Sequence, residues 1–364
     1  HIRGIRGMGL LIRPWSHRDV EALAELWLNR RGEPHPLRPD GVREWLLSQV
    51  TGNTFFDREG LLLAFRTESD DGCGSRGRLV GMVHAAFPPS GEYLLPLRSD
   101  ASESSGAAHA PPTAFREGIL TMMITDESLP EDEQRYIIKG LLERAESYLR
   151  GRHVQTIYGG GIRPLNNPPF WNGFCGAGDA WGIPDEQKLV HEVLGEAGYQ
   201  EVRHTVVWRR KNSLPPPIVG EIVAARHHCQ ATLCEWEPAT AWEMLTMQPG
   251  APLEFRVHTP DGTRLGRLVL RKLSTISPEG GQPTDLFVTH WMSSDPVGGR
   301  VQATRREIVL VLMDAAVELL RRQSPGGMIE WILCSDPTFA MRADVARVFG
   351  FEIVKRGTVR RGGS

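Results

Sequence analysis

The stretch EGILTMMITDESLPEDEQRYIIKGLLERAESYLRG, residues 117–151, predicts a buried strand that runs into a helix through a proline turn. Its first nine residues are mostly apolar, and apolar residues at helical spacing follow Pro130. A helix N-terminus that follows a strand is a common phosphate site, because its first N–H groups lack partners. Here, however, the helix begins with three acidic residues, 131–133, and has no glycine before Gly140.

The composition is that of a soluble globular protein with more than one domain. The 364 residues exceed one ordinary core, and 40% of them are hydrophobic and 24% charged. A net charge of −2 offers no basic field for nucleic acid, and no apolar run approaches the roughly 20 residues that span a bilayer. Five scattered cysteines favour reduced thiols, so we expect a cytoplasmic protein.

Two irregular segments organise the chain. Three consecutive prolines end the stretch NSLPPP, residues 212–217, and predict an extended linker. The region 88–112, rich in Ser, Ala, Gly and Pro, predicts a flexible insertion in the first half. The expected parts are an N-terminal tail (1–9), a first domain (10–212), a linker (213–217) and a second domain (218–364).

Both halves show the same order of expected elements: strand, helix, hairpin, strand, helix, strand, helix, strand. This order indicates an internal duplication. The strands of the first half are expected at 10–15, 60–67, 78–87, 117–125, 153–160 and 202–211, and its helices at 19–28, 41–50, 131–150 and 186–197. Those of the second half are expected at 227–236, 252–273 (a hairpin), 284–294, 328–335 and 351–361, and its helices at 239–247, 304–323 and 338–349.

Several phrases of the sequence resemble the GCN5-related N-acetyltransferase (GNAT) superfamily, in two tandem copies. LLIRPWSHRDVEALAELW (residues 10–27) is similar to the family's first strand and helix, and GRLVGMVHAAFPP (77–89) to its third strand. HEVLGEAGYQEV (191–202) and ADVARVFGFEIV (343–354) both resemble its closing helix, glycine turn and last strand. The resemblance implies an α/β protein of the α+β mixed-sheet type. Each domain would have a mostly antiparallel sheet, a splayed parallel strand pair and flanking helices.

The resemblance also implies acyl-CoA, most simply acetyl-CoA, as a co-substrate whose arm lies between the splayed strands. The family binds the pyrophosphate on a Gln/Arg-x-x-Gly-x-Gly/Ala loop at the next helix. In the first half Glu133, Tyr136 and Ile138 stand at the three key positions, so the motif is degenerate. Either this helix is a capped helix that has lost the phosphate role, or Arg135 contacts the phosphate.

The corresponding loop of the second half is also degenerate but more basic. Gly298 and Gly299 suit a nest of backbone N–H groups, and Thr304 suits a helix cap that bonds an oxygen. Phosphate contacts are expected from Arg300, Arg305 and Arg306. The alternative is a Gly-Gly turn followed by a solvated basic turn.

For the acyl group, the resemblance implies a backbone N–H of the fourth strand as the donor to the thioester carbonyl. The expected acyl-binding residues are Met123 and Ile124 in the first half and Val288, Thr289 and Trp291 in the second. His290 is the candidate base, since its unperturbed pKa suits neutral pH, and Asp126 and Glu127 are candidate proton relays. The alternatives are a structural histidine and acids that end a strand.

The family's tyrosine acid has no counterpart, because Leu194 and Ala346 stand at its positions. We therefore expect an acyl-CoA-dependent N-acyltransferase that acts on a small-molecule or peptide amine. The alternative is a non-catalytic tandem protein that binds CoA or another small molecule, or acts as a scaffold. No metal is expected, because Cys229 and Cys234 face opposite sides of the expected strand. Nucleic-acid and membrane partners are not expected, and monomer and homodimer both stay open.

Overall fold

The computed structural model describes residues 8–28, 43–44, 46–47, 51–52, 56–68, 77–88, 117–161, 182–238, 240–241, 243–244, 252–276, 283–293 and 303–363. For residues 8, 273–276, 283–284 and 290–293 it describes the backbone alone. The predicted insertion at 88–112, the predicted helices at 41–50 and 239–247, and the site residues Gly298, Gly299 and Arg300 lie wholly or mostly outside these residues.

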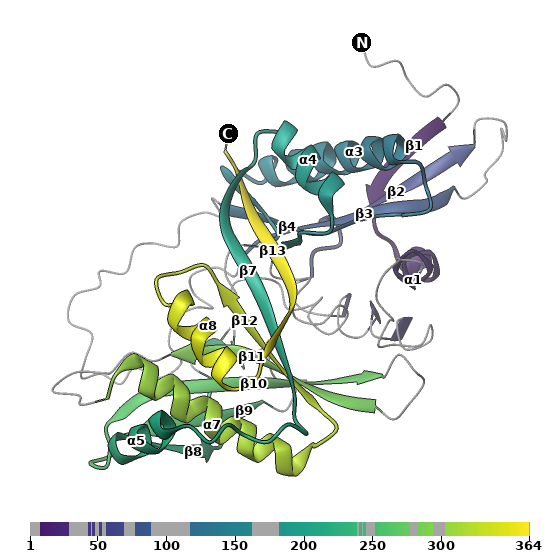
Figure 1. Ribbon diagram of the computed structural model, residues 1–364. Coiled ribbons are helices and arrows are strands. Elements are labelled where there is room, and N and C mark those ends of the chain that lie inside the picture. The colour runs from purple at the N-terminus through teal and green to yellow at the C-terminus, as the bar shows by residue number, and fades with distance from the viewer. Residues whose placement is uncertain are drawn as a thin grey trace. The chain divides into compact units, whose positions relative to one another are not determined.

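The chain forms two compact units (Figure 1). Unit 1 comprises residues 1–88, 113–202 and 357–364. Its sheet has the order β1 (Met8–Pro14), β2 (Leu61–Glu68), β3 (Arg78–Ala86), β4 (Glu117–Thr125), β5 (Thr156–Gly159) and the end of β13 (Glu352–Gly363). The short strand β6 (Ile183–Pro184) also pairs with β13. All of these pairs are antiparallel except β4–β5, which is parallel.

Helices cover both faces of the unit 1 sheet. On one face, α3 (Glu131–Arg150) and α4 (Lys188–Glu196) form a core with inward residues of the strands. On the other face, η1 (His17–Asp19) leads into α1 (Val20–Leu28), whose buried residues pack on the alternate strand residues. The period of two along each strand therefore sends neighbouring residues into two separate cores.

Unit 2 comprises residues 89–112 and 203–356. Its sheet has the order β8 (Gln230–Cys234), β9 (Leu253–His258), β10 (Arg264–Ile276), β11 (Pro283–Ser293), β12 (Met328–Cys334) and β7 (Gln200–Lys211). The β11–β12 pair is parallel and the others are antiparallel. Residues of α5 (Gly220–His228), α7 (Arg305–Gln323) and α8 (Phe339–Val348) share one core with the strand residues of one face.

Each half of the chain gives its last strand to the unit formed mainly by the other half. β13 pairs with β5 from Arg360↔Gly159 to Gly363↔Thr156, and β7 pairs with β12 from Lys211↔Met328 to Thr205↔Cys334. The units are therefore not the continuous segments 10–212 and 218–364 that the linker suggested. Pattern alone cannot show this exchange, because β7 and β13 are similar alternating strands that follow similar helices.

Helix α5 differs from the sequence-based expectation of a strand that begins at 227. The chain is helical from Gly220 to His228, and Ile222 and Ala225 are buried in the unit 2 core. The Cys229 N–H still donates a helical hydrogen bond to the Ala225 carbonyl at 3.0 Å, and the strand β8 begins at the next residue, Gln230. Of the helices that the structure describes, none is long and apolar enough to cross a membrane.

Candidate functional site

Strands β4 and β5 of unit 1 diverge part-way along their length. Their parallel ladder runs from Glu117↔Thr156 to Leu120↔Gly159, and the Gly160 N–H donates to the Leu120 carbonyl at 2.8 Å. β4 continues to Thr125 with no further β5 partner in the described ladder. We call this opening the unit 1 wedge.

A β-bulge lies on β4 where the wedge begins. His84 of β3 faces Thr121 and Met82 faces Ile124, so two β4 residues, Met122 and Met123, occupy the space of one. Met122 has a φ of 56°, which is rare for a residue with a side chain and costs about 1–3 kcal/mol. A bulge re-aims the backbone groups on either side of it, and here these groups border the wedge.

The unit 1 wedge contains a small, mostly apolar pocket of about 20 Å³. This is close to the space of one water molecule, so a larger group must push the lining side chains apart. The lining residues come from β4, from the end of β5, from residues 182–184, and from α4 and the residue before it. They are Leu120, Thr121, Met122, Met123, Ile124, Gly159, Gly160, Gly182, Ile183, Pro184, Gln187, Val190 and Leu194. None of them titrates near neutral pH.

Two glycines at the end of β5 are required by close approach. Gly160 has a φ of +86°, and a Cβ there would lie 2.7 Å from the Ile183 nitrogen. A Cβ on Gly159 would lie 3.3 Å from the Cδ1 atoms of both Ile183 and Leu194. The glycines after Tyr158 therefore allow the backbone of residues 182–183 to lie close to the end of β5. Gly159 and Gly160 also line the pocket of the wedge.

The N-terminus of α3 is held by residues other than the expected cap. Pro130 is the N-cap and no side chain caps the helix. The Gln134 side chain donates to the Leu129 carbonyl at 2.7 Å and accepts a bond of 3.3 Å from Thr125. Glu133 is buried and forms an ion pair with Arg66 at 3.2 Å. The first turn of α3 thus carries three carboxylates, of which the structure buries Glu133.

The other predicted residues of unit 1 have partners outside the wedge. Asp126 is buried in the turn after β4, accepts bonds from the Ser128 N–H (2.9 Å) and hydroxyl (2.6 Å), and pairs with Arg78. Burial alone would raise the pKa of Asp126, but the bonds from Ser128 and the Arg78 charge outweigh it and hold the pKa below its usual value. Glu127 lies in the same turn, and neither acid lines the pocket.

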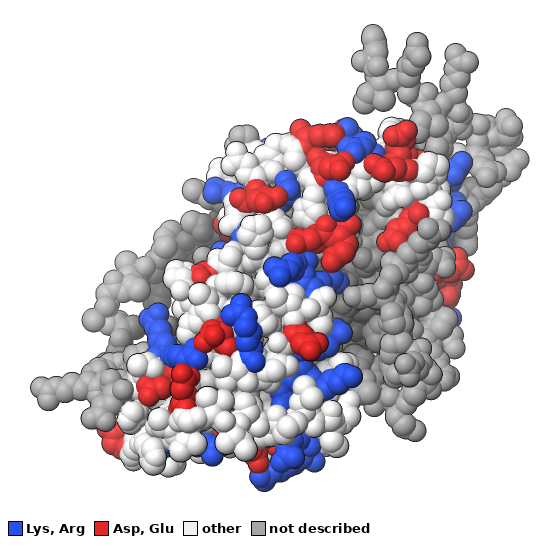
Figure 2. Space-filling model, viewed as in Figure 1, with Lys and Arg blue, Asp and Glu red and all other residues white. Residues whose placement is uncertain are grey.

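Arg135 joins α3 to α4 through ion pairs with two acids of α4. It pairs with Glu196 at 2.7 Å and also with Glu192, while Lys139 pairs with Glu196. Acidic and basic side chains are interspersed on the face shown in Figure 2, in keeping with such local pairing. Met123 and Ile124 are the two residues predicted for unit 1 that the structure brings into the pocket.

The corresponding strands of unit 2 open a second wedge. The β11–β12 ladder ends at Val288↔Glu330, and the Thr289 hydroxyl donates to the Glu330 carbonyl at 3.2 Å just beyond it. In the β10–β11 ladder Leu270 faces Thr289 and Val269 faces Trp291, so His290 is the extra residue of a bulge. Val288 and Thr289 are buried, whereas the side chains of His290 and Trp291 lie outside the described residues.

The N-terminus of α7 has a complete capping box. The Thr304 hydroxyl accepts from the Glu307 N–H at 3.2 Å, and the Glu307 carboxylate accepts from the Thr304 N–H at 2.6 Å. Thr304 is therefore a cap, as its sequence position predicted. The Glu307 carboxylate lies where an anion would bind, and the Thr304 bonds lower its pKa.

The basic residues of α7 also have protein partners. Arg306 pairs with Glu221 of α5 at 3.0 Å and with Asp344 of α8 at 2.5 Å, which ties three helices together. Arg305 is exposed at the first position of the helix.

Among the buried polar residues that the sequence analysis did not identify, two lie next to the wedges. His84 on β3 is fully buried beside Thr121, and burial lowers the pKa of its ring to about 4. Arg271 on β10 is 9% exposed, and burial lowers the pKa of its guanidinium to about 10. Both stand in predicted strands, and no local feature of the sequence indicates that these two polar side chains are enclosed.

Comparison with solved structures identifies the fold. A tandem GNAT protein from the clavulanic acid biosynthesis pathway aligns with a TM-score of 0.57 at 12% identity, covering 98% of each chain. A GCN5-related N-acetyltransferase from Sphaerobacter thermophilus gives 0.55 at 12% identity over 97% of this chain and 95% of that one. A putative acetyltransferase from Pyrococcus horikoshii gives 0.51 at 12% identity over 100% and 92%.

The chain has the GNAT fold, in tandem. No family model matches its sequence, and no curated protein matches it either. At 12% identity the likeness to the solved GNAT structures extends to the architecture alone. The two wedges are the places where this GNAT fold separates its central parallel strands.

Proposed function

We propose that this protein is an acyl-CoA-dependent N-acyltransferase, with acetyl-CoA as the simplest donor, and that the unit 1 wedge holds the acyl-thioester end. The observation that carries the proposal is the coincidence of three features at one point of β4. The parallel ladder ends at Leu120, the bulge follows at Met122, and an apolar pocket lies between them and α4.

The backbone of the wedge supplies what an acyl-thioester arm needs. Beyond Leu120 the side of β4 that faces β5 has no ladder partner among the described residues, so its N–H and C=O groups are available to an amide-bearing arm. A β4 N–H near the bulge would donate to the thioester carbonyl and stabilise the charge that develops there. The apolar side chains of Val190 and Leu194 would exclude water from the acyl group.

The pocket offers no titratable side chain for proton transfer. The amine nitrogen would attack the carbonyl carbon as the neutral base, the C–S bond would break, and the proton would pass to water and the thiolate. We therefore expect the rate of transfer to rise with pH as the acceptor amine deprotonates. A second function, a non-catalytic tandem protein, is favoured by the carboxylates Glu133 and Glu307 in the first turns of α3 and α7.

Calorimetric titration with acetyl-CoA, followed by an acetyl-transfer assay over a panel of amines, tests the proposal. Leu194→Phe narrows the pocket and is expected to weaken acetyl-CoA binding by about tenfold or more. Ala346→Val is the control, because Ala346 stands at the matching position of α8 in unit 2. Equal losses in both variants, or no binding by the wild type, would contradict the proposal and favour the non-catalytic alternative.

A further inference from the structure

The β10 strand of unit 2 carries a buried arginine that has no partner among the residues the structure describes. Arg271 is 9% exposed, and its Nε and Nη1 atoms are buried with no hydrogen-bond acceptor in the described part of the chain. No described carboxylate forms an ion pair with it. An arginine stays protonated in a protein, so burial without a counter-charge is strongly unfavourable. Such a residue needs a specific explanation.

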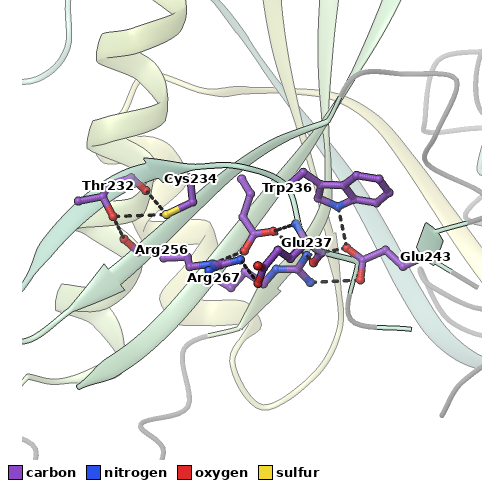
Figure 3. A network of polar contacts seen from close by, with 8 residues as sticks. Thr232, Cys234, Trp236, Glu237, Glu243, Arg256 and Arg267 are labelled. Atoms are coloured by element: carbon purple, nitrogen blue, oxygen red, sulfur yellow. Dashed lines mark hydrogen bonds and ion pairs between the residues drawn. The ribbon is translucent and has the colours of Figure 1, made fainter. Parts of the chain in front are cut away.

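The two other arginines of this unit that the structure describes as buried are satisfied. Arg267, four residues earlier on the same strand, binds Glu243 and Glu254 at 2.8 Å each and the Glu237 carbonyl at 2.6 Å (Figure 3). Arg210, which is 2% exposed, donates to four backbone carbonyls at 2.6–3.0 Å. Among the described residues, Arg271 therefore differs from Arg267 and Arg210 in having no acceptor for its buried nitrogens.

The position of Arg271 links it to the unit 2 wedge. Arg271 pairs with Val288 in the β10–β11 ladder, and Val288 pairs with Glu330 in the β11–β12 ladder. Opposite residues of neighbouring strands point to the same face of a sheet, so the three form one row. That row is the last one before β11 and β12 separate. The opposite face is the helix-covered core that contains Leu270 and Phe287.

The nearby carboxylates of this face are already held by other cations. Glu330 accepts from Arg209 at 2.5 and 2.8 Å. Glu254 and Glu243 accept from Arg267, and Glu254 also accepts from Arg256 at 2.5 Å (Figure 3). An anion that forms an ion pair with Arg271 must therefore come from outside the described residues.

We propose that Arg271 binds the oxyanion group, a carboxylate or a phosphate, of a small molecule that occupies this face of unit 2 beside its wedge. The forked guanidinium accepts both groups in a bidentate manner. The inference does not depend on acyl transfer in unit 1, and unit 2 would bind this ligand whether or not unit 1 is an enzyme.

Thermal unfolding in salts of equal ionic strength tests the inference on the full chain. Sodium chloride is the reference, succinate probes a carboxylate and inorganic phosphate probes a phosphate, each at tens of millimolar. The melting temperature of the wild type is expected to rise by about 2 °C or more in one of the two anions. Which anion acts identifies the group that the ligand carries.

Arg271→Met is expected to abolish this rise and to melt no lower than the wild type in chloride, because it removes an unpaired buried charge. Lys272→Met, a change at the next residue of β10, is the control and should keep the response. A wild type that responds to neither anion, or an Arg271→Met variant that responds as the wild type does, would overturn the inference. If Arg271→Met does not fold, Arg271→Lys should give a weaker response, and an undiminished one would contradict the proposal.

Discussion

Units 1 and 2 each separate a pair of parallel strands, β4–β5 in unit 1 and β11–β12 in unit 2, and each has a bulge beside the separation. The residues around the two wedges nevertheless differ. In unit 1 the wedge is lined mostly by apolar side chains, and burial lowers the pKa of the nearby His84 to about 4, so its ring is neutral at pH 7. In unit 2 the face beside the wedge carries buried charges, which include Arg267, Arg271 and Glu330. An apolar lining suits an acyl chain, whereas buried cations suit an anion.

The two units also hold their helix N-termini by different means. Helix α3 of unit 1 starts at Pro130 with no side-chain cap, while α7 of unit 2 starts with the Thr304–Glu307 capping box. In both helices the first turn carries a carboxylate, Glu133 in α3 and Glu307 in α7. The two helices therefore share an acidic first turn and differ in how that turn is capped.

The largest expected effect is on the charged face of unit 2. Arg267→Met removes the cation that holds Glu243 and Glu254, and Glu254 is fully buried. Breaking a buried pair by removing one partner costs about 3–5 kcal/mol, so urea unfolding should show a loss of stability of that order. Arg271→Met is the matched control, because it removes an unpaired charge from the same strand. Equal losses in both variants would contradict the contrast between these two arginines.

The next effect belongs to unit 1 and depends on pH. The folded protein holds His84 with a pKa of about 4, compared with about 6.5 in the unfolded chain. Between these values only the unfolded chain takes up the proton, so stability is full above pH 6.5 and is lost as the pH falls toward 4. This difference in the pKa of His84 corresponds to about 3 kcal/mol in the free energy of unfolding.

Urea unfolding at pH 7 and at pH 4.5 measures this dependence. His84→Gln should flatten it, and His153→Asn, at an exposed position of the same unit, should leave it unchanged. A His84→Gln variant with the full pH dependence of the wild type would show that other groups cause it.

The smallest expected effect concerns the helix caps. Thr304→Ala removes the hydroxyl that accepts from the Glu307 N–H and should destabilise unit 2 by about 1 kcal/mol. Ser128→Ala, before the uncapped α3, should change stability by less than about 0.5 kcal/mol, because Ser128 is exposed and bonds only within its turn. Urea unfolding measures the free energy of unfolding of both variants. A larger loss of stability for Ser128→Ala than for Thr304→Ala would contradict the conclusion that Thr304 caps its helix and Ser128 does not.

Much of the fold follows from local signals in the sequence. Gly198 and Gly350 follow the ends of helices α4 and α8. They have φ values of +86° and +72° with open space around a Cβ, so glycine is needed there for its backbone conformation. Helix α7 and strands β4 and β12 follow from their apolar patterns. The order of these elements indicated an internal duplication, and the phrases that resemble the GNAT superfamily predicted the tandem GNAT fold.

Other features depend on long-range packing and have no local signature. The exchange of β7 and β13 depends on which sheet edge each strand meets, and α5 formed because Ile222 and Ala225 reach the unit 2 core. The sequence did not indicate that Arg135 and Arg306 form ion pairs with acids on neighbouring helices. The burial of Arg271 was not predicted for a similar reason, since the segment 267–273 predicts a strand but not what covers its arginine-bearing face.

Hydrogen exchange with and without acetyl-CoA tests most directly whether unit 1 is the acyl-binding half. If its wedge holds the acyl-thioester arm, the amides of residues 117–125 and 156–160 should exchange more slowly in the presence of acetyl-CoA, and those of residues 283–293 should not change. Protection of residues 283–293 alone, or no protection in either wedge at millimolar acetyl-CoA, would contradict this account.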